Sequence, residues 1–254
     1  MFYKGRGALM KLKIFIILVL IMIAGGFIWN WYVFNPKNLD FPEDIDHLKY
    51  KVYWTILPLG EVLIDINENY QYEGNKAILI EANLKTTGIA DKLLKLRGKI
   101  QTVVDDEKLL PMVYKEVINR AGEKKESKTL IYEQDKKRLY VGSETYILPS
   151  NTYDPLSLIY FLKNKKLSVG NIYELNINSN QSNYRVTFNI IEKVQVKNHS
   201  LLILKGKSER RIGEKARHRT SFNIYLDADT NIPVLIKAFT ALGPIRIKLL
   251  KKVL

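Results

Sequence analysis

Apolar and polar residues alternate along most of the chain after residue 47. In the first such stretch Leu48, Tyr50 and Val52 fall on one face, and Lys49 and Lys51 fall on the other. A period of two is typical of a β-strand with one buried face. The same pattern predicts strands over Leu48–Ile56, Glu61–Ile66, Ala77–Leu84, Lys99–Val104, Met112–Asn119, Ser127–Glu133, Arg138–Leu148, Ile172–Ile177, Tyr184–Glu192, Ser200–Ser208, His218–Leu226, Pro233–Phe239 and Ile245–Leu250.

Turn residues separate these strands, as in Leu57–Gly60, Arg120–Gly122, Gln134–Lys136, Asn178–Asn183 and Asp227–Asn231. Many short strands joined by tight turns are typical of antiparallel all-β domains. So many strands do not form a flat sheet. We therefore predict an all-β fold, with one large curved antiparallel sheet or half-barrel, or two packed sheets, and one or two short helices.

Two segments favour a helix. Ile89–Leu96 is short and weakly amphipathic, so we expect one or two turns at a corner of the sheet. Asp154–Lys163 is clearer, because Asp154 suits an N-cap and Pro155 suits the first helical position. This second helix is apolar nearly all round, so we expect it inside the concavity of the sheet or across its mouth.

The N-terminus carries a basic and then apolar pattern. Lys4, Arg6, Lys11 and Lys13 precede an uncharged run from Ile14 to Phe34 that ends in aromatic residues. At ~1.5 Å rise per residue this run spans roughly the ~30 Å of a bilayer core, and the basic residues favour a cytoplasmic N-terminus. We expect a single-pass anchor in the inner membrane, with the domain in the periplasm or otherwise outside the cytoplasm.

A cleaved signal peptide is the alternative, with Ile14–Ile23 as its apolar region and Ala24 and Gly26 before the cleavage point. The protein would then be secreted to the periplasm. In either case we divide the chain into an N-terminal segment 1–34, a linker 35–47 rich in proline and acidic residues, and an exported β-rich domain 48–254.

The composition limits the function classes. The formal charge is +14, which often indicates nucleic-acid binding, but an exported domain meets anionic lipids and envelope polymers instead. A second interpretation assigns part of this charge to solvated surface lysines, because the chain is rich in Lys and Asn. The absence of cysteine excludes lipoprotein modification, thiolate metal sites and a cysteine nucleophile.

Candidate catalytic and metal motifs are weak. His47, His199 and His218 have no metal-ligand spacing, and we expect neither a metal nor another cofactor. Asp227 and Asp229 begin like a calcium loop, but Ile232 stands where that loop needs glycine, so a hairpin turn is favoured. A hydrolase whose carboxylates converge only in three dimensions stays open as a rival interpretation.

A basic hairpin is the most distinctive charged feature. Its cations are Lys205, Lys207, Arg210 and Arg211 on one arm, and Arg217 and Arg219 on the other. One interpretation is a solvated edge ribbon that resists aggregation. The functional interpretation is attraction to an anionic headgroup or polysaccharide, at about 1 kcal/mol per cation near such a surface.

Three motifs carry a family resemblance. They are the strand Leu48–Trp54 leading to Pro58 and Gly60, the helix that begins Asp154-Pro155-Leu156-Ser157, and the closing hairpin with Leu226 and Pro233-Val234. Together they resemble the bacterial family of exported proteins called domain of unknown function 3108, over roughly Leu48 to Leu254. The resemblance implies an envelope-located β-rich domain, with no catalytic residues to carry over.

We therefore expect a non-enzymatic envelope protein that binds an apolar or amphiphilic molecule, such as a lipid or lipid-linked glycan. The expected ligand-binding residues are Leu156, Leu158, Ile159, Phe161 and Leu162 of the apolar helix, with Trp54. The alternative is an assembly or scaffold protein that docks a partner through strand edges and the basic hairpin.

Overall fold

The computed structural model describes residues 38–251 apart from 123–124, 180, 213–214 and 241–242, and leaves the side chains of 212 and 215–219 undescribed. Leu39 to Leu254 forms one compact unit, which holds the whole hydrophobic core described below. No helix in the described ranges is long and apolar enough to cross a bilayer. The expected membrane segment Ile14–Phe34 lies outside those ranges.

The fold is all-β, as predicted, and the described residues form fifteen strands in one sheet and two short helices. The strands are β1 (His47–Trp54), β2 (Leu57–Tyr72), β3 (Asn75–Thr86), β4 (Arg97–Asp105), β5 (Pro111–Asn119), β6 (Glu126–Glu133), β7 (Arg138–Val141), β8 (Glu144–Ile147), β9 (Thr152–Tyr153), β10 (Ile172–Ser179), β11 (Ser182–Val196), β12 (His199–Ile212), β13 (Lys215–Asp227), β14 (Pro233–Thr240) and β15 (Gly243–Leu249).

The order across the sheet is β8-β7-β6-β5-β4-β3-β2-β1-β15-β14-β13-β12-β11-β10-β9. Every neighbouring pair is antiparallel except β9 and β10. The centre of the sheet is the pairing of β1 with β15, where Tyr50 lies opposite Leu249. The first and last strands of the domain therefore join two consecutive meanders into one surface.

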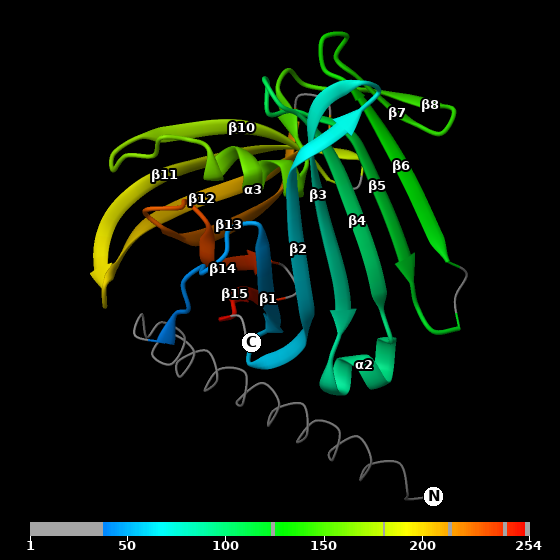
Figure 1. Cartoon of the computed structure of the whole chain (residues 1–254). Helices are drawn as coiled ribbons and strands as arrows, with labels where there is room; N and C mark the ends of the chain where they lie inside the picture. The colour runs from blue at the N-terminus through cyan, green and yellow to red at the C-terminus, as the bar shows by residue number, and fades with distance from the viewer. Residues whose placement is uncertain (1–37, 123–124, 180, 213–214, 241–242, 252–254) are drawn as a thin grey trace, which may run out of the picture. The chain divides into compact units, whose positions relative to one another are not determined.

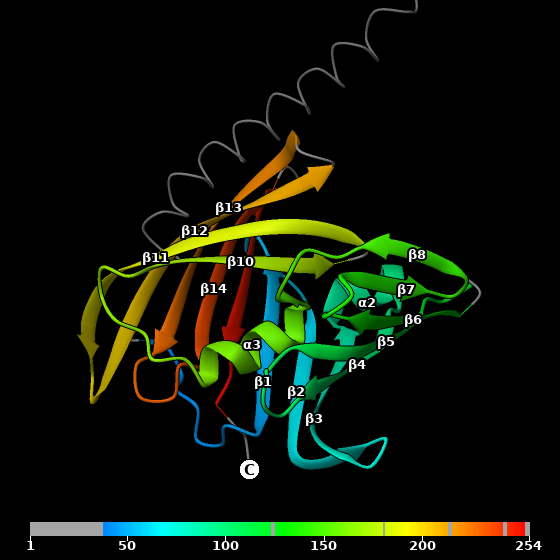
Figure 2. The same ribbon diagram turned by 90° about the horizontal axis from the view of Figure 1, so that it is seen from above.

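The sheet curves until its two edges approach each other (Figures 1 and 2). β8 and β9 form opposite edges, yet only residues 148–151 connect them, and a chain of that length spans at most about 18 Å. Two side chains bridge the gap: Asn183 donates to the Ile147 carbonyl at 3.0 Å, and Asn176 donates to the Ser150 carbonyl at 2.9 Å. The prediction of a curved sheet or half-barrel is confirmed.

Both predicted helices are present. Helix α2 (Gly88–Leu94) connects β3 to β4, and helix α3 (Pro155–Lys163) follows β9. Seen from above, α3 lies within the curve of the strands, as its apolar surface predicted (Figure 2). Its side chains Leu158, Phe161 and Leu162 pack with the core cluster of β10–β13, which includes Phe188 and Leu204.

Two local predictions need correction. The β1–β2 turn lies at Thr55 and Ile56, before the Leu57–Gly60 segment that we expected to turn. Gly60 is a strand residue. This strand position requires glycine, because a Cβ there would lie 2.3 Å from the carbonyl oxygen of Lys85 on β3. The expected single strand Arg138–Leu148 is two strands, β7 and β8, separated by a turn in which Gly142 has a φ of 60°.

Candidate ligand-binding site

Side chains on the concave face are more buried near α3, which we call the closed end, than at the opposite end, which we call the open end. Antiparallel register shows which residues share this face, because directly opposed residues point to the same side. On β1, Leu48 and Tyr50 are 2% and 3% exposed, whereas Val52 is half-buried and Trp54 is 41% exposed. Burial thus decreases along the strand from the α3 end toward the opposite end.

The other strands show the same gradient on the same face. On β3, Ile78 and Ile80 are buried and Leu84 is half-buried; on β15, Leu249 is buried and Ile247 is half-buried. The half-buried concave residues near the open end define what we call the open-end face. Its members are Val52, Val62, Leu84, Ile100, Phe222, Ile245 and Ile247, with Trp54 at its margin. Ile100 lies opposite the buried Ala82, and Phe222 also packs against the core cluster that contains Leu162.

The N-terminus of α3 is fixed by the buried residue Asp154. Its Oδ1 accepts hydrogen bonds from the backbone N–H groups of Leu156 (2.8 Å) and Ser157 (3.1 Å). The Ser157 hydroxyl in turn accepts from the Asp154 backbone N–H, which completes a capping box. The Thr102 hydroxyl on β4 also donates to Asp154 at 3.2 Å, so the cap attaches the helix to the sheet.

Asp154 is an unusual carboxyl group. Burial raises its pKa above the ordinary value, although the hydrogen bonds from Ser157 and Leu156 oppose that shift. Its Oδ2 is buried and has no hydrogen-bond partner among the described residues. Because Oδ1 holds the helix start, we interpret this carboxyl group as structural.

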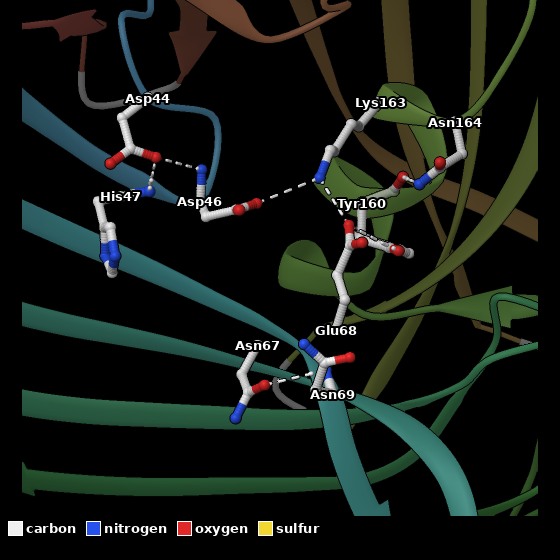
Figure 3. A network of polar contacts seen from close by, with 9 residues as sticks. All are labelled: Asp44, Asp46, His47, Asn67, Glu68, Asn69, Tyr160, Lys163 and Asn164. Carbon is white, nitrogen blue, oxygen red and sulfur yellow. Dashed lines mark hydrogen bonds and ion pairs between the residues drawn. The ribbon is translucent and has the colours of Figure 1, made fainter.

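The C-terminal turn of α3 is fixed by a second polar network (Figure 3). The ammonium group of Lys163 lies 2.8 Å from Glu68 on β2 and 3.4 Å from Asp46, which directly precedes β1. The Tyr160 hydroxyl donates to the same Glu68 carboxylate at 3.1 Å. The hydrogen bond from Lys163 is the main reason why the pKa of Glu68 is lowered. The Asp46 loop is itself held by Asp44, whose carboxylate accepts from two backbone N–H groups.

The predicted ligand-binding residues therefore divide into two places. Leu156 and Leu162 are buried, and Leu158, Ile159 and Phe161 are half-buried on the same helix at the closed end. Phe161 also packs against Tyr153, with ring centroids 4.7 Å apart. Trp54 lies at the opposite, open end, so the structure does not bring it together with the helix residues. The role of this set in ligand binding stays a prediction.

The basic hairpin also divides. Lys205, Lys207 and Arg211 alternate onto the convex face of β12, whereas Arg210 lies opposite Tyr184 of β11 on the concave face. The Nε of Arg210 is buried and has no hydrogen-bond partner among the described residues. The register row of Arg210 continues through Tyr184 and Ile177 to Tyr153, which directly precedes the cap of α3. The side chains of Arg217 and Arg219 lie outside the described ranges.

Our sequence analysis did not identify the residues of the open-end face as one set. Its residues alternate like those of the buried core, and only the position of α3 distinguishes the two. Gly206 was a usable signal, because a Cβ there would lie 2.4 Å from the Phe222 ring. A glycine opposite an aromatic residue indicates that the ring lies across the neighbouring strand on that face.

Two cavities lie elsewhere on the molecule. One of ≈ 190 Å³ is lined by residues before β1, including Phe41 and Asp44, together with Leu63 and Leu249. The other, of ≈ 270 Å³, is lined by the β4–β5 and β6–β7 turns, including Met112 and Tyr132. Across the described ranges, no group of three or more His, Asp or Glu side chains is placed to hold a metal ion.

The fold and the site define a β-barrel-like domain whose interior is closed by a helix at one end. The family described as "Protein of unknown function (DUF3108)" matches residues 49–250, and the chain belongs to this family. The family expected from the three sequence motifs is thereby confirmed.

One solved structure has a similar architecture. A β-barrel-like protein of the domain of unknown function DUF1849 from Brucella abortus superposes with a TM-score of 0.54 at 11% identity, covering 81% of this chain and 95% of that one. A putative exported protein with a YmcC-like fold from Bacteroides fragilis gives a TM-score of 0.33 at 9% identity, covering 84% and 99%. No protein with a curated description matches the sequence. At these identities the likeness concerns the fold alone.

Proposed function

We propose that this protein is a non-enzymatic envelope protein that binds an apolar or amphiphilic molecule, such as a lipid or lipid-linked glycan, on the open-end face. The observation that carries the proposal is the burial gradient along the concave face. A single-domain protein normally buries the apolar face of its sheet completely, and α3 does so at the closed end only. The apolar side chains left half-buried at the open end offer a surface to a hydrocarbon chain.

A charge on the concave face supports an amphiphilic ligand. Arg210 lies on this face opposite Tyr184, and its Nε has no hydrogen-bond partner among the described residues. An anionic or polar headgroup carried into the concavity would pair with this guanidinium group. A guanidinium group is well suited to phosphate, because it presents several donors in one plane.

The buried carboxylates support a non-enzymatic role. Asp154 holds the start of α3, and Asp227 holds the β13–β14 turn by accepting from the backbone N–H and the hydroxyl of Thr230. They lie on different elements and each is used by its own turn or cap. A glycosidase or hydrolase would instead need such groups to converge on one cleft.

The location belongs to the proposal as well. Basic residues before the apolar run Ile14–Phe34 favour export of the domain, either anchored in the inner membrane or released after cleavage. The expected partners are accordingly a membrane, through this N-terminal segment, and lipid or an anionic envelope polymer, through the concave face and the basic hairpin. Nucleic acid is not an expected partner.

The scaffold alternative depends on free strand edges. The edge strand β8 offers one, and its Ile147 side chain is 85% exposed. However, the Ile147 carbonyl already accepts a hydrogen bond from Asn183, and the Ser150 carbonyl accepts one from Asn176. These side chains occupy part of the edge, so the concave face is the better candidate.

Native mass spectrometry of residues 39–254, purified without detergent, tests the proposal. We expect bound lipid that organic extraction removes, and uptake of the fluorescent probe N-phenylnaphthylamine after extraction. Val52→Trp should fill part of the open-end face and reduce both signals. Lys51→Trp is the matched control, because it adds the same ring to the opposite face of β1. A folded parent domain with neither bound lipid nor probe uptake would overturn the proposal.

A further inference from the structure

The exposed apolar side chains of this domain gather at its open end. Twelve large apolar side chains are exposed among the described residues, and seven of them belong to three connections at this end. They are Trp54, Ile56 and Leu57 at the β1–β2 turn, Ile89, Leu93 and Leu94 on α2, and Phe239 at the end of β14. We call this set the rim.

The three connections are neighbours in space. The backbone N–H of Thr55 donates to the Pro244 carbonyl at 2.9 Å, which joins the β1–β2 turn to the β14–β15 connection. The backbone N–H of Thr87 donates to the Leu59 carbonyl at 3.0 Å, which joins the start of α2 to β2. A Cβ on Gly243 would lie 3.2 Å from the Trp54 indole nitrogen, so this ring rests against the third connection. The three connections that carry the rim residues are therefore adjacent.

The most exposed rim residues are those that point away from the sheet. Leu93 is 78% exposed, Ile56 is 73% exposed and Ile89 is 70% exposed, whereas Ala90 on the same helix is buried against the domain. A short helix with one buried residue and three exposed large apolar residues contributes little hydrophobic burial to the stability of the domain. Such clusters typically mark an interaction surface.

The charges near the rim indicate the chemistry of the partner. Lys92 and Lys95 are exposed beside Leu93 and Leu94, and neither forms a salt bridge within the described ranges. Asp91, the acidic residue of α2, is already paired with Arg97 at 2.6 Å. Exposed apolar residues framed by unpaired cations match an anionic bilayer surface.

We propose that the rim is a membrane-docking surface: Ile56, Ile89 and Leu93 enter the interfacial region of an anionic bilayer, and Lys92 and Lys95 contact lipid phosphates. This inference goes beyond the ligand proposal, because Ile56 lies in the β1–β2 turn and Ile89 and Leu93 lie on α2, outside the strands that form the concave face. Docking would hold the mouth against the membrane. It would also add a second contact to the one expected from the N-terminal segment.

Vesicle sedimentation of residues 39–254 tests the docking surface. This part contains the whole core, and each variant is first compared with the parent by thermal unfolding. With vesicles of phosphatidylethanolamine and phosphatidylglycerol we expect Ile89→Ser with Leu93→Ser to reduce the partition coefficient at least tenfold. Ile172→Ser is the matched control, because Ile172 is 73% exposed but lies at the start of β10, away from the rim, and it should change partitioning less than twofold.

The charge contribution is measured separately. Lys92→Gln with Lys95→Gln should weaken binding to phosphatidylglycerol vesicles several-fold in low salt, and the difference should shrink in 1 M salt, where the Debye length is about 3 Å. Equal partitioning of the parent, the double serine variant and the Ile172→Ser control would overturn the inference. So would a parent domain that does not associate with these vesicles.

Photocrosslinking in the full chain distinguishes the occupants of the rim. A benzophenone amino acid at position 93, in membranes, should form adducts with phospholipid. Adducts with residues 1–38 of the same chain, or with a second copy, would overturn the proposal in favour of those occupants. The double serine variant should retain N-phenylnaphthylamine uptake, so loss of docking and loss of the concave ligand site are separate results.

Discussion

The burial gradient makes a quantitative prediction for two isoleucines on neighbouring strands. Ile80 on β3 and Ile100 on β4 share the concave face, since Ile80 lies opposite Thr102 and Ile100 lies two residues before Thr102. Ile80 is 1% exposed and Ile100 is half-buried. Isoleucine to alanine at both positions removes the same atoms from the same face, so the difference in the free energy of unfolding reports the surroundings alone.

The expected costs differ about threefold. Each change removes about three methylene equivalents, worth ~0.8 kcal/mol apiece when fully buried. Ile80→Ala also leaves a cavity in packed surroundings, so we expect a loss of about 3 to 4 kcal/mol. Ile100→Ala loses only part of the transfer free energy, and water or ligand can enter the space, so about 1 kcal/mol is expected.

Urea unfolding followed by circular dichroism measures both losses, with the slope of each transition compared to show that unfolding stays two-state. N-phenylnaphthylamine titration should show unchanged uptake for the folded Ile80→Ala variant, but weaker uptake for Ile100→Ala. Equal losses of stability at the two positions, with no uptake by the parent, would mean that the open-end face is packed core. The reasoning from half-burial to ligand binding would then be refuted.

Two further predictions concern α3 and the concave face. Asp154→Asn keeps the Oδ1 acceptor, and because burial raises the pKa of Asp154, the protonated carboxyl stabilises the fold below about pH 4 and loses that advantage as pH rises through the raised pKa. The stability of this variant relative to the parent should therefore increase from pH 4 to 7 in urea titrations. Asp154→Ala should cost about 1 to 3 kcal/mol at pH 4 and less at pH 7, because it lacks the same titrating group; a pH-independent difference for Asn would contradict the shift. Gly206→Ala should lower stability by about 1 to 3 kcal/mol, because its Cβ would lie 2.4 Å from the Phe222 ring and 2.7 Å from the Thr187 carbonyl oxygen. Gly98→Ala, whose Cβ would meet movable side-chain ends, should cost less in the same thermal unfolding assay, and equal shifts would argue against a rigid contact at Gly206.

The elements that the sequence predicted well are those determined by local chemistry. Asp154 and Pro155 specified the start of α3, and the hydrogen bonds of the capping box show why: the side chain binds backbone groups only two and three residues away. The hairpin turn after Asp227 was predicted for the same reason, since its carboxylate binds Thr230 within the turn. Such signals do not depend on the rest of the fold.

The failures concern features determined by distant residues. Pro58 and Gly60 have turn-like composition, yet they lie in β2 at a bulge, and Gly60 is needed for the close approach of the Lys85 carbonyl oxygen on β3. The parallel strand β9 was not predicted, because its two residues are extended only through pairing with β10. Period-two alternation determines which side chains face inward, but it does not reveal which end of the face α3 covers.

The way α3 is held determines where a ligand would enter. Asp154 fixes one end of the helix to β4 through Thr102, and Lys163 fixes the other end to Glu68 and Asp46. Moving α3 aside would separate the Asp154 carboxylate from the Thr102 hydroxyl, and the largely buried Lys163 ammonium group from two carboxylates. This movement costs free energy, because buried polar groups without partners are not compensated for their lost solvation. Among the residues that the structure describes, no such clamp crosses the half-buried apolar residues at the opposite end. Under the proposed function an apolar chain therefore enters at the rim and lies against the open-end face. Its headgroup then remains at the end that the rim would hold against a membrane.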